Sequence, residues 1–218
     1  MPWHGRGTFG LILWRKTMKF QPHFFIAAGL SLLLTGNAMA QADETRAKKI
    51  VGGTCFLCHG AQGESASEVF PRLAGQNADY IAKQLDNFKS GKRKSGAMND
   101  MVANLTADEM AALGRFFAKQ PVMTDPVKDA PLASVGAYLY AHGNKFSGVP
   151  ACASCHGVNA TGTDSLPRLA GQHAAYTEGQ LKQFSQRERA NDNSIMHSVA
   201  VKMTALEMAA VAEYLSGK

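Results

Sequence analysis

The sequence predicts an all-α protein made of two tandem copies of one small helical domain. One unit occurs twice, because Cys55-Phe-Leu-Cys58-His59-Gly60 returns 97 residues later as Cys152-Ala-Ser-Cys155-His156-Gly157. Neither copy shows the strict alternation of apolar and polar residues that predicts a half-buried strand. Each copy also contains a capping box, Thr106-x-x-Glu109 and Thr204-x-x-Glu207, which predicts the start of a helix. These observations together indicate a duplicated helical fold.

The repeat extends well beyond the cysteine motifs. Pro71-Arg-Leu-Ala-Gly-Gln76 recurs as Pro167-Arg-Leu-Ala-Gly-Gln172, at an offset of 96 residues. The same offset relates Tyr80, Gln84, Leu85, Phe88 and Arg93 to Tyr176, Gln180, Leu181, Phe184 and Arg189. Near the end of each copy the offset becomes 98, so that Met98 corresponds to Met196. The changing offset indicates small loop insertions within two otherwise equivalent domains.

The first 40 residues predict an export signal that is removed from the mature protein. They carry basic residues and no acidic one, contain an apolar run from Phe24 to Leu34, and end in the small-residue site Ala38-Met39-Ala40. Met18 followed by Lys19 would itself begin an ordinary signal, so a start at Met18 is an alternative. The apolar run has about ten residues, whereas a membrane-spanning helix needs about 20. We therefore expect an exported chain without a transmembrane segment.

A linker separates the two predicted domains. Residues 119–131 contain three prolines and little apolar pattern, which is typical of a semi-rigid connection. A boundary near Thr124 gives an N-terminal domain of residues 41–124 and a C-terminal domain of residues 125–218.

Three helices are predicted for each domain. The last helix begins at the capping box, and its apolar residues follow helical spacing. A middle helix is expected over residues 78–90 and again over 174–186, and the first helix of the second domain over 132–142. The corresponding helix of the first domain is expected before Cys55. Three short helices in about 90 residues form a thin core, which a large apolar cofactor would complete.

The mature chain carries little net charge. The full sequence has a formal charge of +6, but removal of residues 1–40 leaves 19 basic residues against 17 acidic ones, a charge of +2. The basic character belongs largely to the predicted signal. It therefore does not indicate nucleic-acid binding.

The cysteine spacing predicts covalent attachment of two haem groups. Cys-x-x-Cys-His is the attachment pattern of c-type haem, in which two thiols bond the vinyl groups and the next histidine binds the iron. The attaching residues are expected to be Cys55, Cys58, Cys152 and Cys155. His59 and His156 are then the expected iron ligands.

Three other interpretations of the cysteines are weaker. Exported proteins often contain disulfides, and a CxxC pair also occurs in thioredoxin-like redox sites and in zinc sites. A redox pair needs no following histidine, and a zinc site would have to draw ligands from both halves. The presence of the full motif in both copies favours haem.

The second ligand of each iron is expected to be a methionine. Only two pairs of methionines occupy equivalent places in both repeats, Met98 with Met196 and Met110 with Met208. The second pair lies on the apolar faces of the last helices, where methionine is usually core filling. Met98 and Met196 are expected in loops just before those helices, and a loop can carry a ligand across the face of the haem.

We favour Met98 and Met196 over Met101 and Met203 as the ligands. A thioether favours ferrous iron more than a second imidazole does, so it raises the reduction potential. An iron with both axial positions filled has no open site for a substrate. The ligand set therefore favours electron transfer over catalysis.

The repeated proline and arginine are candidates for supporting roles. Pro71 and Pro167 follow the haem histidines by 12 and 11 residues. Their carbonyl groups are candidates to accept the Nδ1–H of each histidine and fix its orientation. Arg72 and Arg168 are candidate partners of the haem propionates.

Three histidines have no counterpart in the other half. His142, His173 and His197 are therefore expected to be ordinary surface residues. His197 is adjacent to Met196 and is the one alternative iron ligand among them. If it replaced the methionine, the potential of the second haem would be much lower.

The sequence resembles the two-haem class I cytochromes called cytochrome c4 over nearly the whole mature chain. The resemblance rests on the paired CxxCHG sites, both PRLAGQ strings, the Tyr-x-x-x-Gln-Leu-x-x-Phe helices, Gly148-Val-Pro-Ala-Cys152 and the Met-x(6)-Leu/Met-Thr approach to each last helix. It implies two class I cytochrome c domains related by pseudo-two-fold symmetry. It also implies iron ligation by His59 with Met98 and by His156 with Met196.

The resemblance further implies a periplasmic electron carrier rather than an enzyme. Its partners would be redox proteins, a respiratory donor complex and a terminal oxidase or similar acceptor, with peripheral membrane association and no small-molecule substrate. One alternative is the cytochrome subunit of a flavocytochrome sulfide dehydrogenase, which a flavoprotein partner would indicate. Another is a dihaem thiosulfate dehydrogenase, which would require a labile or unusual iron ligand.

Overall fold

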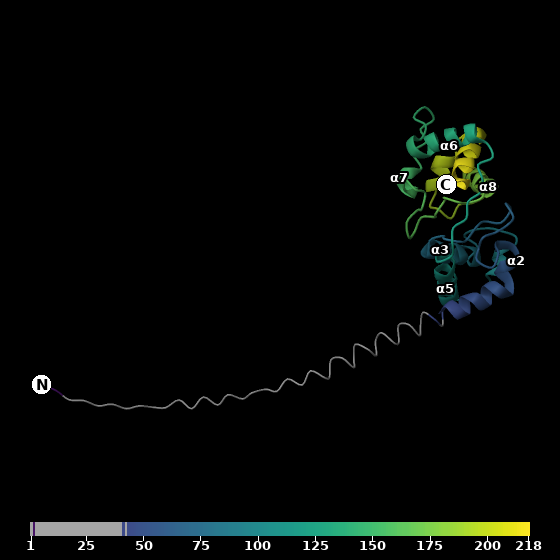
Figure 1. Ribbon diagram of the computed structural model, residues 1–218, viewed down its shortest axis with the longest axis vertical. Coiled ribbons are helices and arrows are strands. Elements are labelled where there is room, and N and C mark those ends of the chain that lie inside the picture. The colour runs from purple at the N-terminus through teal and green to yellow at the C-terminus, as the bar shows by residue number, and fades with distance from the viewer. Residues whose placement is uncertain (1, 3–40, 42) are drawn as a thin grey trace. The chain divides into compact units, whose positions relative to one another are not determined.

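In the computed structural model, the chain is described at residues 2, 41 and 43–218, and it forms helices joined by long loops (Figure 1). Within this described part, the only β pairing is an isolated antiparallel bridge between Asn144 and Val149. The prediction of an all-α fold is confirmed. The predicted export signal and the alternative start at Met18 lie outside the described residues. No helix of the described part is long and apolar enough to cross a membrane.

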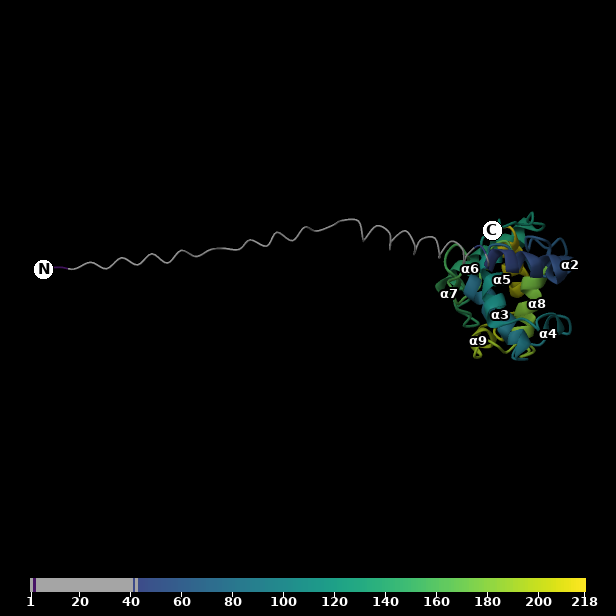
Figure 2. The ribbon, with the colours of Figure 1, turned by 90° about the horizontal axis from the view of Figure 1, so that it is seen from below.

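The first half is built around two helices that pack side by side. These are α3 (Ala78–Lys89) and α5 (Ala107–Ala118), which lie next to each other in Figure 2. Residues 43–50 are helical and continue into the π-helix η1 (Val51–Cys55) and the single turn α2 (Phe56–His59). The buried core of this half consists of Ala47, Val51, Ile81, Ala112, Leu113, Phe116 and Phe117.

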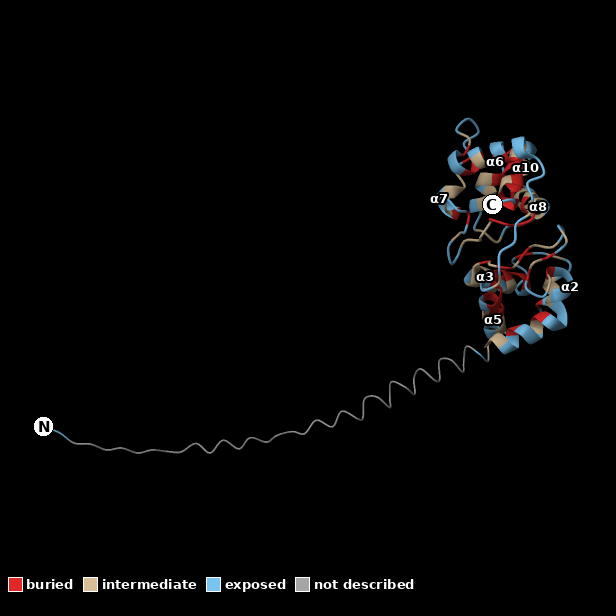
Figure 3. Cartoon of the chain, viewed as in Figure 1, coloured by how far each residue is buried: buried red, intermediate tan, exposed pale blue. Residues whose placement is uncertain are grey.

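The second half repeats this arrangement. Its last helix, α10 (Ala205–Ser216), packs on both α6 (Ala130–His142) and α8 (Ala174–Ser185). The single turn α7 (Ala153–His156) and the short helix α9 (Ile195–Ala200) complete the half. Figure 3 shows buried residues on the inner sides of these helices.

Local capping signals fix where the helices begin. Thr106 accepts a hydrogen bond from the backbone of Glu109, whose side chain accepts one from the backbone of Thr106, and the same box occurs at the start of α10. Helix α6 begins two residues before the predicted position, because the Asp129 side chain accepts from the N–H of Leu132 at 2.9 Å. An aspartate at this place satisfies a backbone donor that the first helical turn leaves free.

Glycines allow close helix packing in both halves. A Cβ at Gly136 of α6 would lie 1.9 Å from the carbonyl oxygen of Ala210 in α10. In the first half, a Cβ at Gly114 of α5 would lie 2.3 Å from the carbonyl oxygen of Ala78. Neither position therefore has room for a side chain.

Candidate cofactor sites

Each cysteine motif folds into a single helical turn. Cys55 is the N-terminal cap of α2 and Cys152 is that of α7, so the two cysteines of a motif and the histidine after them share one turn. Residues three apart in a helix lie on the same face. None of the four cysteines is paired in a disulfide. The turn thus presents two sulfur atoms and one imidazole in the order that haem attachment requires.

A proline carbonyl fixes the orientation of each motif histidine. The Nδ1 of His59 lies 2.9 Å from the carbonyl oxygen of Pro71, and that of His156 lies 3.3 Å from the carbonyl oxygen of Pro167. A carbonyl can only accept, so Nδ1 carries the proton and the lone pair of Nε2 is left for a metal. The predicted role of the two prolines is confirmed.

Burial keeps both imidazoles neutral. It lowers the pKa of His59 and of His156 below the usual value, and the proline carbonyls, which act in the opposite direction, do not compensate. A neutral imidazole is the form that binds iron. The environment of the two histidines therefore fits their predicted role as haem ligands.

The first cysteine of each motif, Cys55 and Cys152, is partly buried. Burial raises the pKa of the Cys152 thiol to about 11, and it also raises the pKa of Cys55. A catalytic redox pair depends on a lowered thiol pKa. The direction of the shift is opposite to the one that a thioredoxin-like site needs, which argues against a redox pair.

Met98 and Met196 lie in short helices and not in loops, so this part of the prediction is wrong. Met98 is the first residue of α4 (Met98–Met101), and Met196 lies in the first turn of α9. Polar side chains start both turns: the N–H of Met98 donates to the Ser95 hydroxyl at 3.3 Å and that of Met196 to the Asp192 carboxylate at 2.5 Å. Both methionines are partly buried.

Met101 and Met203, the alternative iron ligands, differ from each other in burial. Met101 is 54% exposed whereas Met203 is only 9% exposed, so this pair does not occupy equivalent environments. Met110 and Met208 are both fully buried, as expected for core filling. Outside the core, Met98 and Met196 are the pair that is both equivalent in sequence and similarly buried.

Arg72 joins the two halves, and its pairing with a propionate stays a prediction. Its guanidinium donates to the carbonyl of Gly171 at 2.7 Å and to the carboxylate of Asp125 at 2.6 Å. Its Nε donates to the carbonyl of Glu64 at 3.2 Å. All three guanidinium nitrogens thus have protein acceptors. For Arg168 the propionate role stays a prediction.

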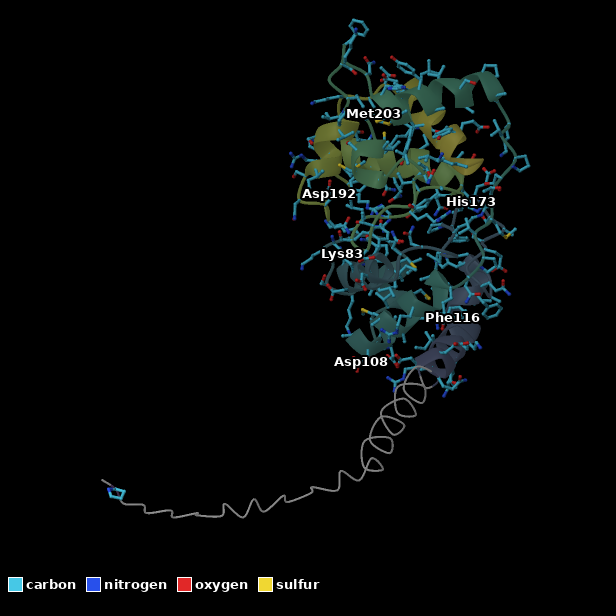
Figure 4. The ribbon with its side chains drawn as sticks, turned by 60° about the vertical axis from the view of Figure 1, so that its left-hand side comes forward. Lys83, Asp108, Phe116, His173, Asp192 and Met203 are labelled. Carbon is cyan, nitrogen blue, oxygen red and sulfur yellow. The ribbon has the colours of Figure 1, made fainter. Side chains whose placement is uncertain are left out.

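His173 is buried between the two halves, so the prediction of a surface histidine is wrong (Figure 4). Only 3% of the residue is exposed. Its Nε2 lies 2.9 Å from the carbonyl oxygen of Ser65, and its Nδ1 lies 2.9 Å from the carboxylate of Asp125. Each ring nitrogen of His173 therefore lies within hydrogen-bond distance of an oxygen from another segment of the chain.

The other two histidines behave differently. His142 is exposed, as predicted, and its ring packs near that of Tyr138. The Nδ1 of His197 lies 2.9 Å from the carbonyl oxygen of Phe184, and its Nε2 accepts from the Nε of Arg187 at 3.2 Å. Both nitrogens of His197 are therefore engaged, which argues against it as an iron ligand.

The end of each PRLAGQ string holds the two halves together. The side chain of Gln76 hydrogen-bonds the backbone of Arg168, and the side chain of Gln172 hydrogen-bonds the backbone of Arg72. Sequence reasoning did not assign a role to these glutamines. The signal that could have found them is the identity of a polar string in both copies, which a simple turn would not require.

A second shared cluster lies between the middle helices. Arg93 donates to the hydroxyl of Tyr176 at 2.9 Å, and Arg189 donates to the hydroxyl of Tyr80 at 2.9 Å. Both arginines also donate to Gln180. The residues of this cluster are the ones that the repeat preserves, so the duplication preserved the contact between the halves as well as the haem motifs.

Fold and site define the class of protein. The chain has two helical domains, each with a turn of two thiols and an oriented neutral histidine, and it matches the family model described as cytochrome c over residues 136–217. Over residues 42–117 it matches the model described as cytochrome c oxidase, cbb3-type, subunit III. The protein is a two-haem c-type cytochrome that transfers electrons, and Cys55, Cys58, Cys152 and Cys155 form its two attachment sites for covalent haem c.

Comparison of the sequence and the structure with known proteins identifies one family within this class. The chain is 43% identical to cytochrome c4 of Thiocapsa roseopersicina over 81% of its length and 91% of the relative. It is 38% identical to cytochrome c4 of Pseudomonas aeruginosa over 86% of its length and 94% of the relative. The solved structure of reduced cytochrome c4 from Pseudomonas stutzeri superposes with a TM-score of 0.73 at 34% identity, covering 82% of this chain and 97% of that one. The chain belongs to the cytochrome c4 family.

A second group of relatives is named for the enzyme from which those proteins accept electrons. The chain is 36% identical to the thiosulfate dehydrogenase electron acceptor of Thiomonas intermedia, over 76% of its length and 78% of the relative.

Proposed function

We propose that the mature chain is a periplasmic electron carrier that accepts electrons from respiratory donors and delivers them to a terminal oxidase or similar acceptor. Three features support the proposal: the predicted export signal, the resemblance to cytochrome c4 and two sites of the same ligand type. A bound haem supplies an iron that gains and loses one electron. In each site two cysteines would hold the haem through thioether bonds, and a histidine and a methionine would bind its iron, which would leave no position for a substrate.

The observation that carries the proposal is the matched environment of the two sites. His59 and His156 are both buried, both neutral and both oriented by a proline carbonyl. We propose His59 with Met98, and His156 with Met196, as the iron ligands. Two saturated irons of similar type fit a carrier better than a dihaem enzyme, which would need one open or labile site.

Spectroscopy of the mature protein tests this ligation. In the wild type we expect two low-spin haems and the near-red absorption band of iron bound to methionine. The variants Met98→Ala and Met196→Ala should each lose about half of that band. Met101→Ala is the matched control, because Met101 lies on the same helix as Met98 and should leave the band unchanged. A wild-type haem that is high-spin, or ligated by two histidines, would contradict the proposal and favour catalysis.

A second candidate donor is a thiosulfate dehydrogenase. The similarity to proteins named as electron acceptors of that enzyme favours it. Stopped-flow mixing of the oxidised protein with a purified thiosulfate dehydrogenase and thiosulfate measures this directly. Reduction at a rate that saturates with dehydrogenase concentration would assign this donor. Reduction only by a respiratory donor complex would exclude it.

A further inference from the structure

One peptide group contacts both a haem ligand and the opposite half of the molecule. The carbonyl of Pro71 and the N–H of Arg72 belong to the same peptide unit. The carbonyl accepts from Nδ1 of His59 at 2.9 Å, and the N–H donates to Oε1 of Gln172 at 2.9 Å. A continuous hydrogen-bonded chain therefore runs from the histidine of the first half to the glutamine of the second.

An equivalent hydrogen-bonded chain runs from the histidine of the second half to the glutamine of the first. The carbonyl of Pro167 faces Nδ1 of His156 at 3.3 Å, and the N–H of Arg168 donates to Oε1 of Gln76 at 2.7 Å. Each glutamine thus acts on the ligand histidine of the other half and not on its own.

Each glutamine oxygen is held rigidly. The Oε1 of Gln172 also accepts from the N–H of His173 at 3.0 Å, while its Nε2 donates to the carbonyl of Arg72 at 3.0 Å. The Oε1 of Gln76 accepts from the N–H of Asn77 at 2.9 Å in the same way. Both glutamines are buried. Hydrogen bonds in such a site are stronger than in water and polarise one another.

Resonance carries this polarisation through the peptide group. When the N–H donates a hydrogen bond, electron density shifts toward the carbonyl oxygen of the same amide. The oxygen then becomes a stronger acceptor for the Nδ1–H of the histidine. A stronger bond at Nδ1 makes the imidazole a more basic ligand. A more basic ligand stabilises ferric iron and lowers the reduction potential.

We propose that Gln172 and Gln76 are positioning residues that set the reduction potential of the haem in the opposite half. Gln172 acts on the haem attached at Cys55 and Cys58, and Gln76 acts on the haem attached at Cys152 and Cys155. The proposal rests on the proposed ligation of the irons by His59 and His156. Contact between the halves and the potentials of the haems are then coupled properties.

The test measures both potentials in the holoprotein after each glutamine is changed. NMR signals of the haem methyl groups, assigned to each half, report the two potentials separately. Gln172→Leu should raise the potential of the first haem more than that of the second, and Gln76→Leu should do the opposite. In the reduced protein, Gln172→Leu should also shift the Arg72 amide proton and the Nδ1 proton of His59.

Two further variants separate this role from a merely structural one. Gln172→Glu keeps an acceptor for the Arg72 N–H, so it should not raise the potential of the first haem. Asn77→Ala removes side-chain bonds to the carbonyls of Thr161, Thr163 and Leu166 across the same contact, but leaves both ligand peptides intact. It should not change the reduction potential of the haem in the opposite half.

Three results would overturn the proposal. The first is a shift of the potential mainly in the variant's own half, and the second is an equal shift of both haems. The third is the same upward shift for Gln172→Leu and Gln172→Glu, which would mean that loosening of the contact is the cause. Failure of the ligation itself is distinguishable, because it would appear in the wild-type spectrum before any glutamine is changed.

Discussion

The side chain of Gln76 hydrogen-bonds both backbone groups of Arg168. Its Oε1 accepts from the N–H of Arg168 at 2.7 Å, and its Nε2 donates to the carbonyl of the same residue at 2.9 Å. Gln172 makes the equivalent pair with Arg72, at 2.9 Å and 3.0 Å. Such an exchange between equivalent residues is the signature of a two-fold contact. The chain therefore contains the equivalent of a dimer interface within one polypeptide.

Removing both glutamine side chains should uncouple the two halves. A net hydrogen bond contributes about 0.5–1.5 kcal/mol, so the loss of four of them in Gln76→Ala with Gln172→Ala should destabilise the protein by roughly 2–6 kcal/mol. We expect calorimetry of the holoprotein to resolve two unfolding transitions where the wild type shows one. Gln186→Ala, at an exposed glutamine that caps the end of α8, is the control and should leave the thermogram unchanged. A single unshifted transition in the double variant would contradict this prediction.

The Asp125 carboxylate should make the stability of the protein sensitive to acid. Burial acts to raise the pKa of Asp125, but hydrogen bonds from Arg72 and His173 outweigh it and lower the pKa below the usual 3.8. A lowered pKa in the folded state means that the stabilisation is present above about pH 3.8 and is lost as the pH falls through the folded-state pKa. Asp125→Asn should be less stable by about 1–3 kcal/mol at neutral pH.

The pH dependence of that variant provides the check. Urea unfolding at a series of pH values should show the gap between wild type and Asp125→Asn narrowing below about pH 4. A gap that stays constant down to the lowest accessible pH would show that the charge of Asp125 does not contribute. Asp129→Asn is a suitable comparison, because Asn is an equally good helix cap and should change stability little.

Gly136→Ala should be strongly destabilising. The added Cβ would lie 1.9 Å from the carbonyl oxygen of Ala210, so α6 and α10 would have to move apart. Overpacking of this kind typically costs about 1–3 kcal/mol, and the helix backbones involved leave little room for adjustment.

Gly179→Ala is the matched control for the helix crossing. Gly179 lies within α8, and a Cβ there would meet nothing within 4 Å. Alanine in a helix is favoured over glycine by about 0.8–1.0 kcal/mol, so this variant should be as stable as the wild type or more stable. Thermal melting of both variants measures the contrast, and equal effects at the two positions would be inconsistent with the crossing geometry.

The two haems should differ in potential, with the first one lower. The Nδ1 of His59 lies 2.9 Å from its proline carbonyl, whereas that of His156 lies 3.3 Å from its own. The shorter bond makes His59 the more basic ligand, which stabilises ferric iron. A spectroelectrochemical titration should therefore resolve two steps, and the NMR signals of the first half should change in the step at lower potential. The reverse order would mean that another feature of the sites decides their potentials.

Local sequence signals predicted the elements of the fold and the attachment sites. The capping boxes at Thr106 and Thr204 fixed the starts of the last helices, because a cap depends only on residues three positions apart. The CxxCH turns could be recognised for the same reason. Even the contact of His59 with Pro71 could be predicted from the sequence, because the two residues are only 12 positions apart.

The sequence by itself thus determined a duplicated all-α fold and two covalent haem sites, because each depends on neighbouring residues and on a visible repeat. Only the tertiary structure decided how the halves join. It buried His173 between Ser65 and Asp125, placed Arg72 against Gly171, and placed each glutamine on the proline–arginine peptide of the other half. These partners lie 48 to 108 positions apart in the chain. Contacts at such separations depend on how complete domains pack, and the local pattern of apolar and polar residues does not predict them.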